Sequence, residues 1–354
     1  MFTGPQRVLI VRIGAMGDVL HAMPAVAALR KMHPECWIGW AVEPRWLPLL
    51  KAVDAETGKP LVDCTFVAAT RDWKRRPVSR RTFSEIAHLR RETRSGRFDL
   101  CVDMQGSIRS AVIGRMAGAG ELVGPADPRE GPARWLYGRT ARTTARHVIE
   151  QGCELLGAAV GATLQPTSVD FPLDADIEKT CDALLARLLP SGERFVLIAA
   201  TAGWGAKQWP AERFGAVAAE LGRRGYRTLV NAASEQDPIA RSVVAASGGY
   251  AAAAAGDLPL LIALTRRAEL VIAGDTGPLH LAAALRRPVV ALFGPTDPAR
   301  NGPYGTRARV LRHGEERRDH RRLAEPEAGL LAITVEEVVQ AAMELTEGRE
   351  HEDR

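Results

Sequence analysis

Short runs of apolar, mostly β-branched residues alternate with amphipathic stretches along the first half of the chain. RVLIVRI at 7–13 predicts a buried strand, and the segment 18–31 predicts the helix that follows it. Further strands of the same kind are predicted at 37–43, 98–104 and 121–124. Continuous apolar strands separated by helices are typical of a parallel sheet that is covered on both faces.

The alternation begins again after about residue 172. The predicted strands are 195–200, 228–233, 270–275 and 289–294, and the predicted helices are 211–224, 237–247, 278–286 and 333–349. The run AAAAAG at 251–256 predicts a small-residue strand or turn. A polar linker, QPTSVDFPLDAD at 165–176, separates the two series.

The pattern therefore predicts an α/β protein with two Rossmann-like, doubly wound parallel-sheet domains that face a cleft. We expect the first domain at 1–172 and the second at 173–332. Residues 333–354 form a C-terminal helix and tail, which we place back on the first domain. Ligands of such sheets bind beyond the carboxyl ends of the strands, so the loops after strands are the candidate sites.

Composition narrows the class of protein. The chain has 354 residues, 46% of them hydrophobic, which is enough for two cores. A pI of about 9.1 and a net charge of +5 indicate an anionic partner. The five cysteines include no C-x-x-C pair, so neither a disulfide framework nor a zinc site is indicated. No signal peptide and no stretch of about 18 apolar residues is present, and we expect a cytoplasmic protein.

The loop after the first predicted strand contains GAMGD at 14–18. It is not a dinucleotide fingerprint, because a G-x-G-x-x-G pattern from Gly14 needs glycines where Met16 and Val19 stand. Two interpretations of Asp18 remain open. It is either a helix cap, or a carboxylate held at the mouth of the cleft as a base.

The loop after strand 270–275 carries a richer set of side chains. Asp275, Thr276, Gly277 and His280 lie together at the end of a strand and the start of a helix. The N-terminus of that helix could bind a diphosphate, although a plain capped helix has the same appearance. The FGPTDP sequence after the following strand adds a second loop at the same edge.

Two further loops after strands carry charged residues. In TAGWGAKQWP, Lys207 could counter a phosphate, and the small residues, Gly203 among them, leave the backbone accessible. In NAASEQD, Glu235 could accept from ribose hydroxyls. The alternatives are a solvated lysine and an acid that merely starts the next helix.

These motifs together resemble glycosyltransferase family 9, the heptosyltransferases, and within that family the heptosyltransferase I type. The resemblance rests on MGD at 16–18, K-x-W-P at 207–210, D-T-G-x-x-H at 275–280 and G-P-T-D-P at 294–298. It spans about residues 7–305. DMQGSIRSA at 103–111, REG at 129–131 and His147 also match. Ala202 and Gly203 depart from the family's usual hydroxyl pair, and the charged segment 312–329 matches no family pattern.

The resemblance implies a GT-B fold and an inverting, metal-independent transfer of heptose from ADP-heptose to the Kdo region of the lipopolysaccharide inner core. No cofactor is implied. By position, Asp18 matches the general base and Arg129 a contact to the acidic acceptor sugar. Lys207 would stabilise the departing ADP. The remaining donor-binding positions are Gly203, Glu235, Asp275, Thr276, Gly277 and His280.

The segment 71–97 carries ten Arg/Lys against three Asp/Glu. A solvated surface is the ordinary explanation for such a run. For an enzyme whose acceptor is of the Kdo-lipid A type, we expect an acceptor-facing, mobile region that uses Arg75, Arg76, Arg80 and Arg81. We further expect a peripheral location at the inner face of the inner membrane, with an anionic membrane surface as partner. No nucleic acid is expected, because no nucleic-acid-binding fold signature appears.

Two alternatives stay open on the sequence alone. One is another family 9 glycosyltransferase, of the heptosyltransferase II or III type or with a different sugar. The other is a nucleotide- or nucleic-acid-binding protein without catalysis, against which the presence of both Asp18 and Lys207 argues.

Overall fold

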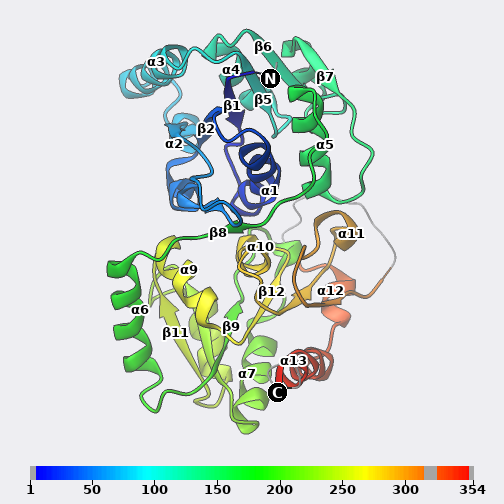
Figure 1. Ribbon diagram of the computed structural model, residues 1–354. Helices are drawn as coiled ribbons and strands as arrows, with labels where there is room; N and C mark the ends of the chain where they lie inside the picture. The colour runs from blue at the N-terminus through cyan, green and yellow to red at the C-terminus, as the bar shows by residue number, and fades with distance from the viewer. Residues whose placement is uncertain (1–4, 315–324, 351–354) are drawn as a thin grey trace. The chain divides into compact units, whose positions relative to one another are not determined.

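The computed structural model describes residues 5–314 and 325–350. The chain divides into two compact units, residues 1–172 and 173–354, each built on its own sheet (Figure 1). Most of the charged segment 312–329 (residues 315–324) and the tail 351–354 lie outside the described residues. Within the described part, no helix is long and apolar enough to cross a membrane.

The first unit contains a six-stranded parallel sheet. Its strands are β1 (Arg7–Val11), β2 (Trp37–Val42), β4 (Cys64–Val67), β5 (Leu100–Asp103), β6 (Glu121–Pro125) and β7 (Arg139–Ala141). Its helices are α1 (Met16–Met32), η1 (Pro44–Lys51), α2 (Thr70–Arg75), α3 (Arg80–Ser95), α4 (Ile108–Ala117), η2 (Gly131–Leu136) and α5 (Val148–Val160). A short antiparallel pair joins β3 (Val53–Asp54) to β8 (Val169–Asp170).

The second unit repeats this plan. Its strands are β9 (Phe195–Ala199), β10 (Arg227–Ala232), β11 (Ala251–Ala255), β12 (Leu270–Gly274), β13 (Val289–Leu292) and β14 (Ala308–Leu311). Its helices are α6 (Ala175–Leu188), η3 (Gly205–Lys207), α7 (Ala211–Arg223), α8 (Pro238–Ala246), α9 (Leu258–Arg267), α10 (Gly277–Ala284), α11 (Pro298–Asn301), α12 (Ala328–Ala332) and α13 (Val335–Glu350).

Both sheets have the doubly wound strand order. The first runs β4-β2-β1-β5-β6-β7 and the second β11-β10-β9-β12-β13-β14, with every pair parallel. In each sheet, the strand that comes first in the chain lies beside the fourth strand of that sheet. The chain therefore reverses its winding direction between β1 and β5, and between β9 and β12, which is where such sheets bind ligands.

The central strands form because their apolar residues are buried on both faces. Every residue of β5, β9, β12 and β13 is buried, as the uninterrupted apolar runs predict. The five alanines of β11 form an edge strand that pairs with β10. Small side chains suffice there, because an edge strand is covered less completely than a central one.

The C-terminal helix packs on the second unit, contrary to the prediction that it returns to the first domain. α13 contacts α7, β13 and β14 of the second unit. Its residues Val338, Ala342 and Leu345 are buried in the core of that unit. The prediction is wrong because an apolar stripe shows that a helix is covered but does not show by what.

Candidate active site

The turn between β1 and α1 carries the first group of candidate residues. Gly14 has φ +156°, and a Cβ at this position would lie 2.7 Å from Nε1 of Trp46. Only glycine fits such a close approach, so the chain can turn sharply from the strand into the helix. The turn places the first residues of α1 at the carboxyl end of β1.

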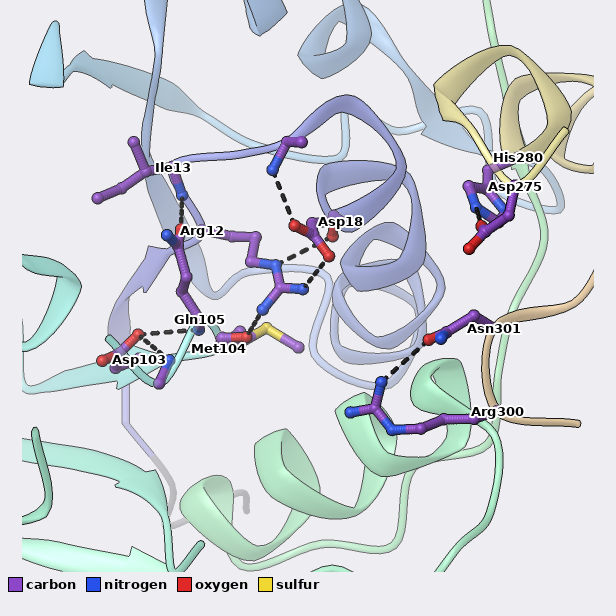
Figure 2. A network of polar contacts seen from close by, with 12 residues as sticks. Arg12, Ile13, Asp18, Asp103, Met104, Gln105, Asp275, His280, Arg300 and Asn301 are labelled. Atoms are coloured by element: carbon purple, nitrogen blue, oxygen red, sulfur yellow. Dashed lines mark hydrogen bonds and ion pairs between the residues drawn. The ribbon is translucent and has the colours of Figure 1, made fainter. Parts of the chain in front are cut away.

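Asp18 lies in the first turn of α1 and makes two contacts there. Its Oδ2 accepts from the backbone N–H of Ala15 at 2.8 Å, and its Oδ1 lies 2.9 Å from Nη2 of Arg12 (Figure 2). The side chain is 38% exposed. Asp18 is therefore a helix cap, and it also keeps acceptor lone pairs for a ligand, because each carboxylate oxygen can accept more than one bond.

Arg12, which the sequence did not single out, holds this turn to the neighbouring strand. Its Nε donates to the backbone oxygen of Asp18 at 3.1 Å, and its Nη1 donates to the backbone oxygen of Met104. The side chain is only 11% exposed. Because Arg12 is itself held by Met104, its contact with Oδ1 fixes the orientation of the Asp18 carboxylate.

The turn after β5 is organised around a buried carboxylate, Asp103. It accepts from the backbone N–H groups of Gln105 and Gly106, at 2.9 and 3.1 Å. It also accepts from the hydroxyls of Ser110 and Tyr137, at 2.9 and 2.8 Å. Burial raises the pKa of Asp103, and these donors oppose the rise.

Gln105 links that turn to the loop after β1. Its Oε1 accepts from the backbone N–H of Ile13 at 2.8 Å (Figure 2). The sheet reverses its winding direction between β1 and β5, and the loops that follow these two strands are therefore hydrogen-bonded to each other. The strand-end motif DMQG was visible in the sequence, but the pairing across strands was not.

Arg129 lies beside the same turn. Gly106 has φ +70°, and a Cβ there would lie 3.0 Å from the backbone nitrogen of Arg129. The next residue, Glu130, donates its N–H to the oxygen of Gly106 and accepts from the N–H of Ile108. The structure therefore places the exposed Arg129 at the edge where β5 and β6 end.

The basic segment forms two helices, α2 and α3. Arg75, Arg76, Arg80 and Arg81 are exposed along the connection between them. The start of α2 is fixed, because Thr70 donates to the buried Glu43 at 2.6 Å and accepts from Arg109 at 2.9 Å.

In the second unit, Lys207, Asp275 and His280 meet at the ends of β9 and β12. The ammonium of Lys207 pairs with Oδ2 of Asp275, and Nε2 of His280 lies 3.2 Å from Oδ1 of the same carboxylate. Thr296, from the loop after β13, also donates to Oδ2, at 2.7 Å. Thr296 was not singled out from the sequence, although its GPTDP loop was.

Asp275 is the centre of this cluster. Its side chain is 7% exposed, so burial raises its pKa, but the bond to His280 and the charge of Lys207 outweigh burial and lower the pKa. The carboxylate therefore carries a negative charge at neutral pH. The side chain of Lys207 is 16% exposed and lies 5.2 Å from the ring centre of Trp204.

Thr276 and Gly277 begin α10, as the sequence predicted. Thr276 is the N-cap and Pro278 follows in the first turn, where a missing N–H costs nothing. The first backbone N–H groups of an eight-residue helix thus lie directly after Asp275.

Gly203 and Glu235 lie on the neighbouring loops. Gly203 is exposed and has no heavy atom within 4 Å of the position of a Cβ. The side chain of Glu235 is 65% exposed, 3.6 Å from Nη1 of Arg187. Within the described residues, no group of three or more His, Cys, Asp or Glu side chains could hold a metal ion.

Doubly wound sheets with charged residues at the point where the winding reverses are typical of nucleotide-binding proteins, and this chain has two such sheets. The model of glycosyltransferase family 9 (heptosyltransferase) matches residues 86–329. The chain belongs to this family and is a glycosyltransferase.

Relatives from two bacteria agree with this assignment. Lipopolysaccharide heptosyltransferase 1 of Pseudomonas aeruginosa is 28% identical over 84% of this chain and 81% of its own length. The Escherichia coli K12 protein of the same name is 27% identical over 88% of this chain and 94% of its own. The structure of E. coli heptosyltransferase WaaC with ADP-2-deoxy-2-fluoro heptose has a TM-score of 0.74 and 25% identity, covering 96% of this chain and 99% of that one. The predicted GT-B fold is confirmed.

Proposed function

We propose that this protein transfers heptose from ADP-heptose to the Kdo region of the lipopolysaccharide inner core, with inversion at the anomeric carbon and without a metal ion. The observation that carries the proposal is the Asp18 carboxylate, held by Ala15 and Arg12 at the carboxyl end of β1 and still 38% exposed. The names of the relatives support lipopolysaccharide as the acceptor, and the ADP-heptose analogue in the similar WaaC structure supports ADP-heptose as the donor.

Asp18 acts as the general base. A sugar hydroxyl is a poor nucleophile at neutral pH, so a carboxylate must take its proton as the oxygen attacks the anomeric carbon. One carboxylate suffices for inversion, because no covalent glycosyl intermediate has to form. Arg12 limits the rotation of the carboxylate, which keeps its free lone pairs pointing in one direction.

Lys207 and the N-terminus of α10 stabilise the negative charge that develops on the departing ADP. The ammonium and the N–H groups at Thr276 and Gly277 lie at the ends of neighbouring strands of one sheet. Such fixed positive groups stabilise a diphosphate leaving group without reorganising, which is why no metal is required in this proposal. Asp275 positions Lys207 and His280, since its buried carboxylate contacts both.

The other predicted contacts complete the proposal. Glu235 would accept from the ribose hydroxyls, and the backbone at Gly203 would approach the nucleotide, where the space beside the Cα is open. Arg129 and the four arginines of the α2–α3 connection would bind the acidic sugars and phosphates of the acceptor, through charge-assisted hydrogen bonds. We propose a peripheral position at the inner face of the inner membrane, where that acceptor is found.

Acceptor-dependent release of ADP tests the proposal. The purified protein is given ADP-heptose with and without Kdo2-lipid A, and the anomeric configuration of the product is determined by NMR. We expect release only with the acceptor, an inverted product, and full activity in the presence of EDTA. A retained configuration, or loss of activity on chelation, would contradict the mechanism.

The choice of substrates is tested by exchanging them. Other ADP-sugars and UDP-sugars replace the donor, and a Kdo2-lipid A that already carries one heptose replaces the acceptor. We expect the rate to fall with each exchange. A higher rate on the heptosylated acceptor would make the protein a heptosyltransferase of the II type.

A further inference from the structure

The helices of the first unit form two groups. α1 contacts η1 and α5, whereas α3 contacts α4, and α4 contacts η2. Right-handed connections in a doubly wound sheet place helices that follow the third to fifth strands on the face opposite to α1. We call the outer surface of α3, α4 and η2, together with the loop 76–79, the basic face.

Large apolar side chains are exposed on the basic face. The exposed fractions are 84% for Trp135, 84% for Val78, 60% for Phe83, 43% for Ile108 and 42% for Val112. Ile108 and Val112 are one turn apart on α4, so they share one side of that helix. Single exposed apolar residues are ordinary on a soluble protein, but four on three packed helices, with a fifth in the loop before α3, indicate a binding surface.

The same face is strongly positive. α3 contains five arginines and two glutamates, while α4 contains two arginines and η2 one, without an acidic residue in either. Only Glu85 among these acids is paired with an arginine of the face, Arg81, at 2.7 Å. The arginines therefore leave an excess of positive charge beside the apolar side chains.

The opposite face of the same unit lacks both features. α1 contains one acidic and two basic residues, η1 two basic residues, and α5 two acidic residues. Within these fully described helices, Met32 is the one large apolar residue that is exposed, at 44%. The composition of the basic face is therefore not a general property of the unit.

The apolar side chains lie toward the edge of the sheet that carries Asp18. Phe83 is in the first turn of α3 and Ile108 is the first residue of α4, which starts where β5 ends. Arg109, the next residue, donates to Thr70 at the start of α2. If the first unit contacts a membrane through these apolar side chains, the carboxyl ends of its strands, where Asp18 lies, remain close to that membrane.

We propose that the basic face docks on an anionic lipid bilayer, with Trp135 and Phe83 in the headgroup region and the arginines on lipid phosphates. Trp135 favours that region because its large apolar ring carries one polar N–H, and the ring of Phe83 adds apolar area beside it. The aliphatic Val78, Ile108 and Val112 favour lipid over nucleic acid, whose bases stack on aromatic rings but gain little from aliphatic side chains. The choice of lipid as partner rests on the proposed function.

Vesicle binding without substrates tests the docking surface. The full chain is sedimented with vesicles of phosphatidylcholine that contain phosphatidylglycerol, and with phosphatidylcholine vesicles alone. We expect the double variant Trp135→Ser/Phe83→Ser to bind the anionic vesicles about tenfold or more weakly, because two aromatic side chains no longer leave water. Arg90→Gln should bind the anionic vesicles about fivefold more weakly, and its remaining binding should be less sensitive to salt than that of the wild type, because one charge fewer is there to be screened.

Matched variants separate docking from folding and catalysis. Met32→Ser, on the opposite face, should bind vesicles like the wild type. The double variant should transfer heptose to a soluble Kdo acceptor at the wild-type rate and lose rate only on acceptor embedded in vesicles.

Three results would overturn the docking surface. The wild type could fail to bind anionic vesicles, or the double variant could bind them with the wild-type affinity. The third result is a wild type that binds single-stranded nucleic acid more tightly than vesicles of equal charge. Wild-type binding that depends on Trp135 and Phe83 without any heptose transfer would instead overturn the proposed function and leave the docking surface standing.

Discussion

At the scale of single residues, an acid in the first turn of a helix is usually explained by the cap that it provides. Asp18 does accept from Ala15, but its second oxygen is held by Arg12, an arginine whose side chain is only 11% exposed and that also reaches the loop after β5. A cap needs no such partner. The arrangement instead fixes a partly exposed carboxylate at a defined angle.

Arg12→Met tests this positioning role. We expect kcat to fall about 10–100-fold, since the carboxylate loses charge-assisted hydrogen bonds that hold its direction. The affinity for ADP should not change, because Arg12 belongs to the first unit, whereas Lys207 and α10 belong to the second. Steady-state kinetics and calorimetry with ADP measure the two effects.

Two further variants complete that experiment. Arg12→Lys should recover only part of the activity, because an ammonium cannot serve Asp18 and Met104 with the same geometry. Arg139→Met removes an arginine that is paired with Glu121 in the same unit, and it should leave kcat near the wild-type value. Equal losses in Arg12→Met and Arg139→Met would reduce Arg12 to a structural ion pair.

Asp275→Asn tests the second cluster through stability. Removing one partner of a buried ion pair should lower the free energy of unfolding by about 3 kcal/mol at neutral pH. The pKa of Asp275 is lowered in the folded state, so its contribution is present above its unfolded pKa and is lost as the pH falls. The difference between variant and wild type should therefore shrink below about pH 4. Denaturant unfolding at several pH values measures it, and a constant difference would contradict it.

The sequence predicted the ionisable residues of the two clusters better than their partners. Asp18, Lys207, Asp275 and His280 follow apolar strands, and loops after strands are where such sheets bind ligands. Arg12 was missed because it lies inside an apolar run. Thr296 was missed because its contact to Asp275 crosses from one strand end to the next.

At the scale of elements, the turn after β5 connects the candidate base to Arg129, the proposed contact to the acceptor. Asp103 orders the turn, Gln105 reaches Ile13, and Gly106 lies against the backbone of Arg129. The positive φ and the close approach together explain why residue 106 is a glycine.

Gly106→Ala should therefore disturb both stability and acceptor binding. A matched control exists in Gly161, which has a similar φ of +74° but no atom within 4 Å of a Cβ. We expect Gly161→Ala to cost about 1 kcal/mol, through backbone strain alone. Gly106→Ala should cost about 2–3 kcal/mol and raise the acceptor KM, because the loop at Arg129 must move. Equal costs and an unchanged KM would contradict this account of the turn.

The central strands were predictable, whereas three of the four edge strands were not. The apolar runs predicted β1, β2, β5, β9, β12 and β13 to within a few residues. The edge strands β4, β7 and β14 were missed, because they are short and partly exposed, so their side chains follow no continuous apolar pattern.

At the scale of the whole molecule, two units with the same strand order carry different charges at equivalent places. An acid follows the first strand of one unit, and a lysine follows the first strand of the other. A base and a cation for the leaving group are the two functions that transfer to a hydroxyl requires. The strand order was predictable as a class, whereas the unit on which α13 packs was not, because both sheets offer apolar faces.

Charge reversal on the α2–α3 connection tests the division of labour between the units. Replacing Arg75, Arg76, Arg80 and Arg81 by glutamate should raise the acceptor KM at least tenfold, because each basic residue near an anionic surface contributes about 1 kcal/mol to binding. ADP affinity should be unchanged, since the donor residues belong to the other unit. Reversal of Lys179 and Arg241, exposed on helices of the second unit, should change neither constant. A parallel loss of ADP affinity would contradict the assignment.

The measurement that tests the central claim most directly is the rate of acceptor-dependent ADP release by Asp18→Asn. The amide keeps the size of the side chain but cannot accept the proton of the attacking hydroxyl. We predict a rate about 10²–10⁴-fold below that of the wild type, with ADP affinity and thermal stability close to those of the wild type. Asp176→Asn, another first-turn acid of a helix, should release ADP normally. Release by Asp18→Asn at the wild-type rate would leave Asp18 a helix cap and contradict its role as the base.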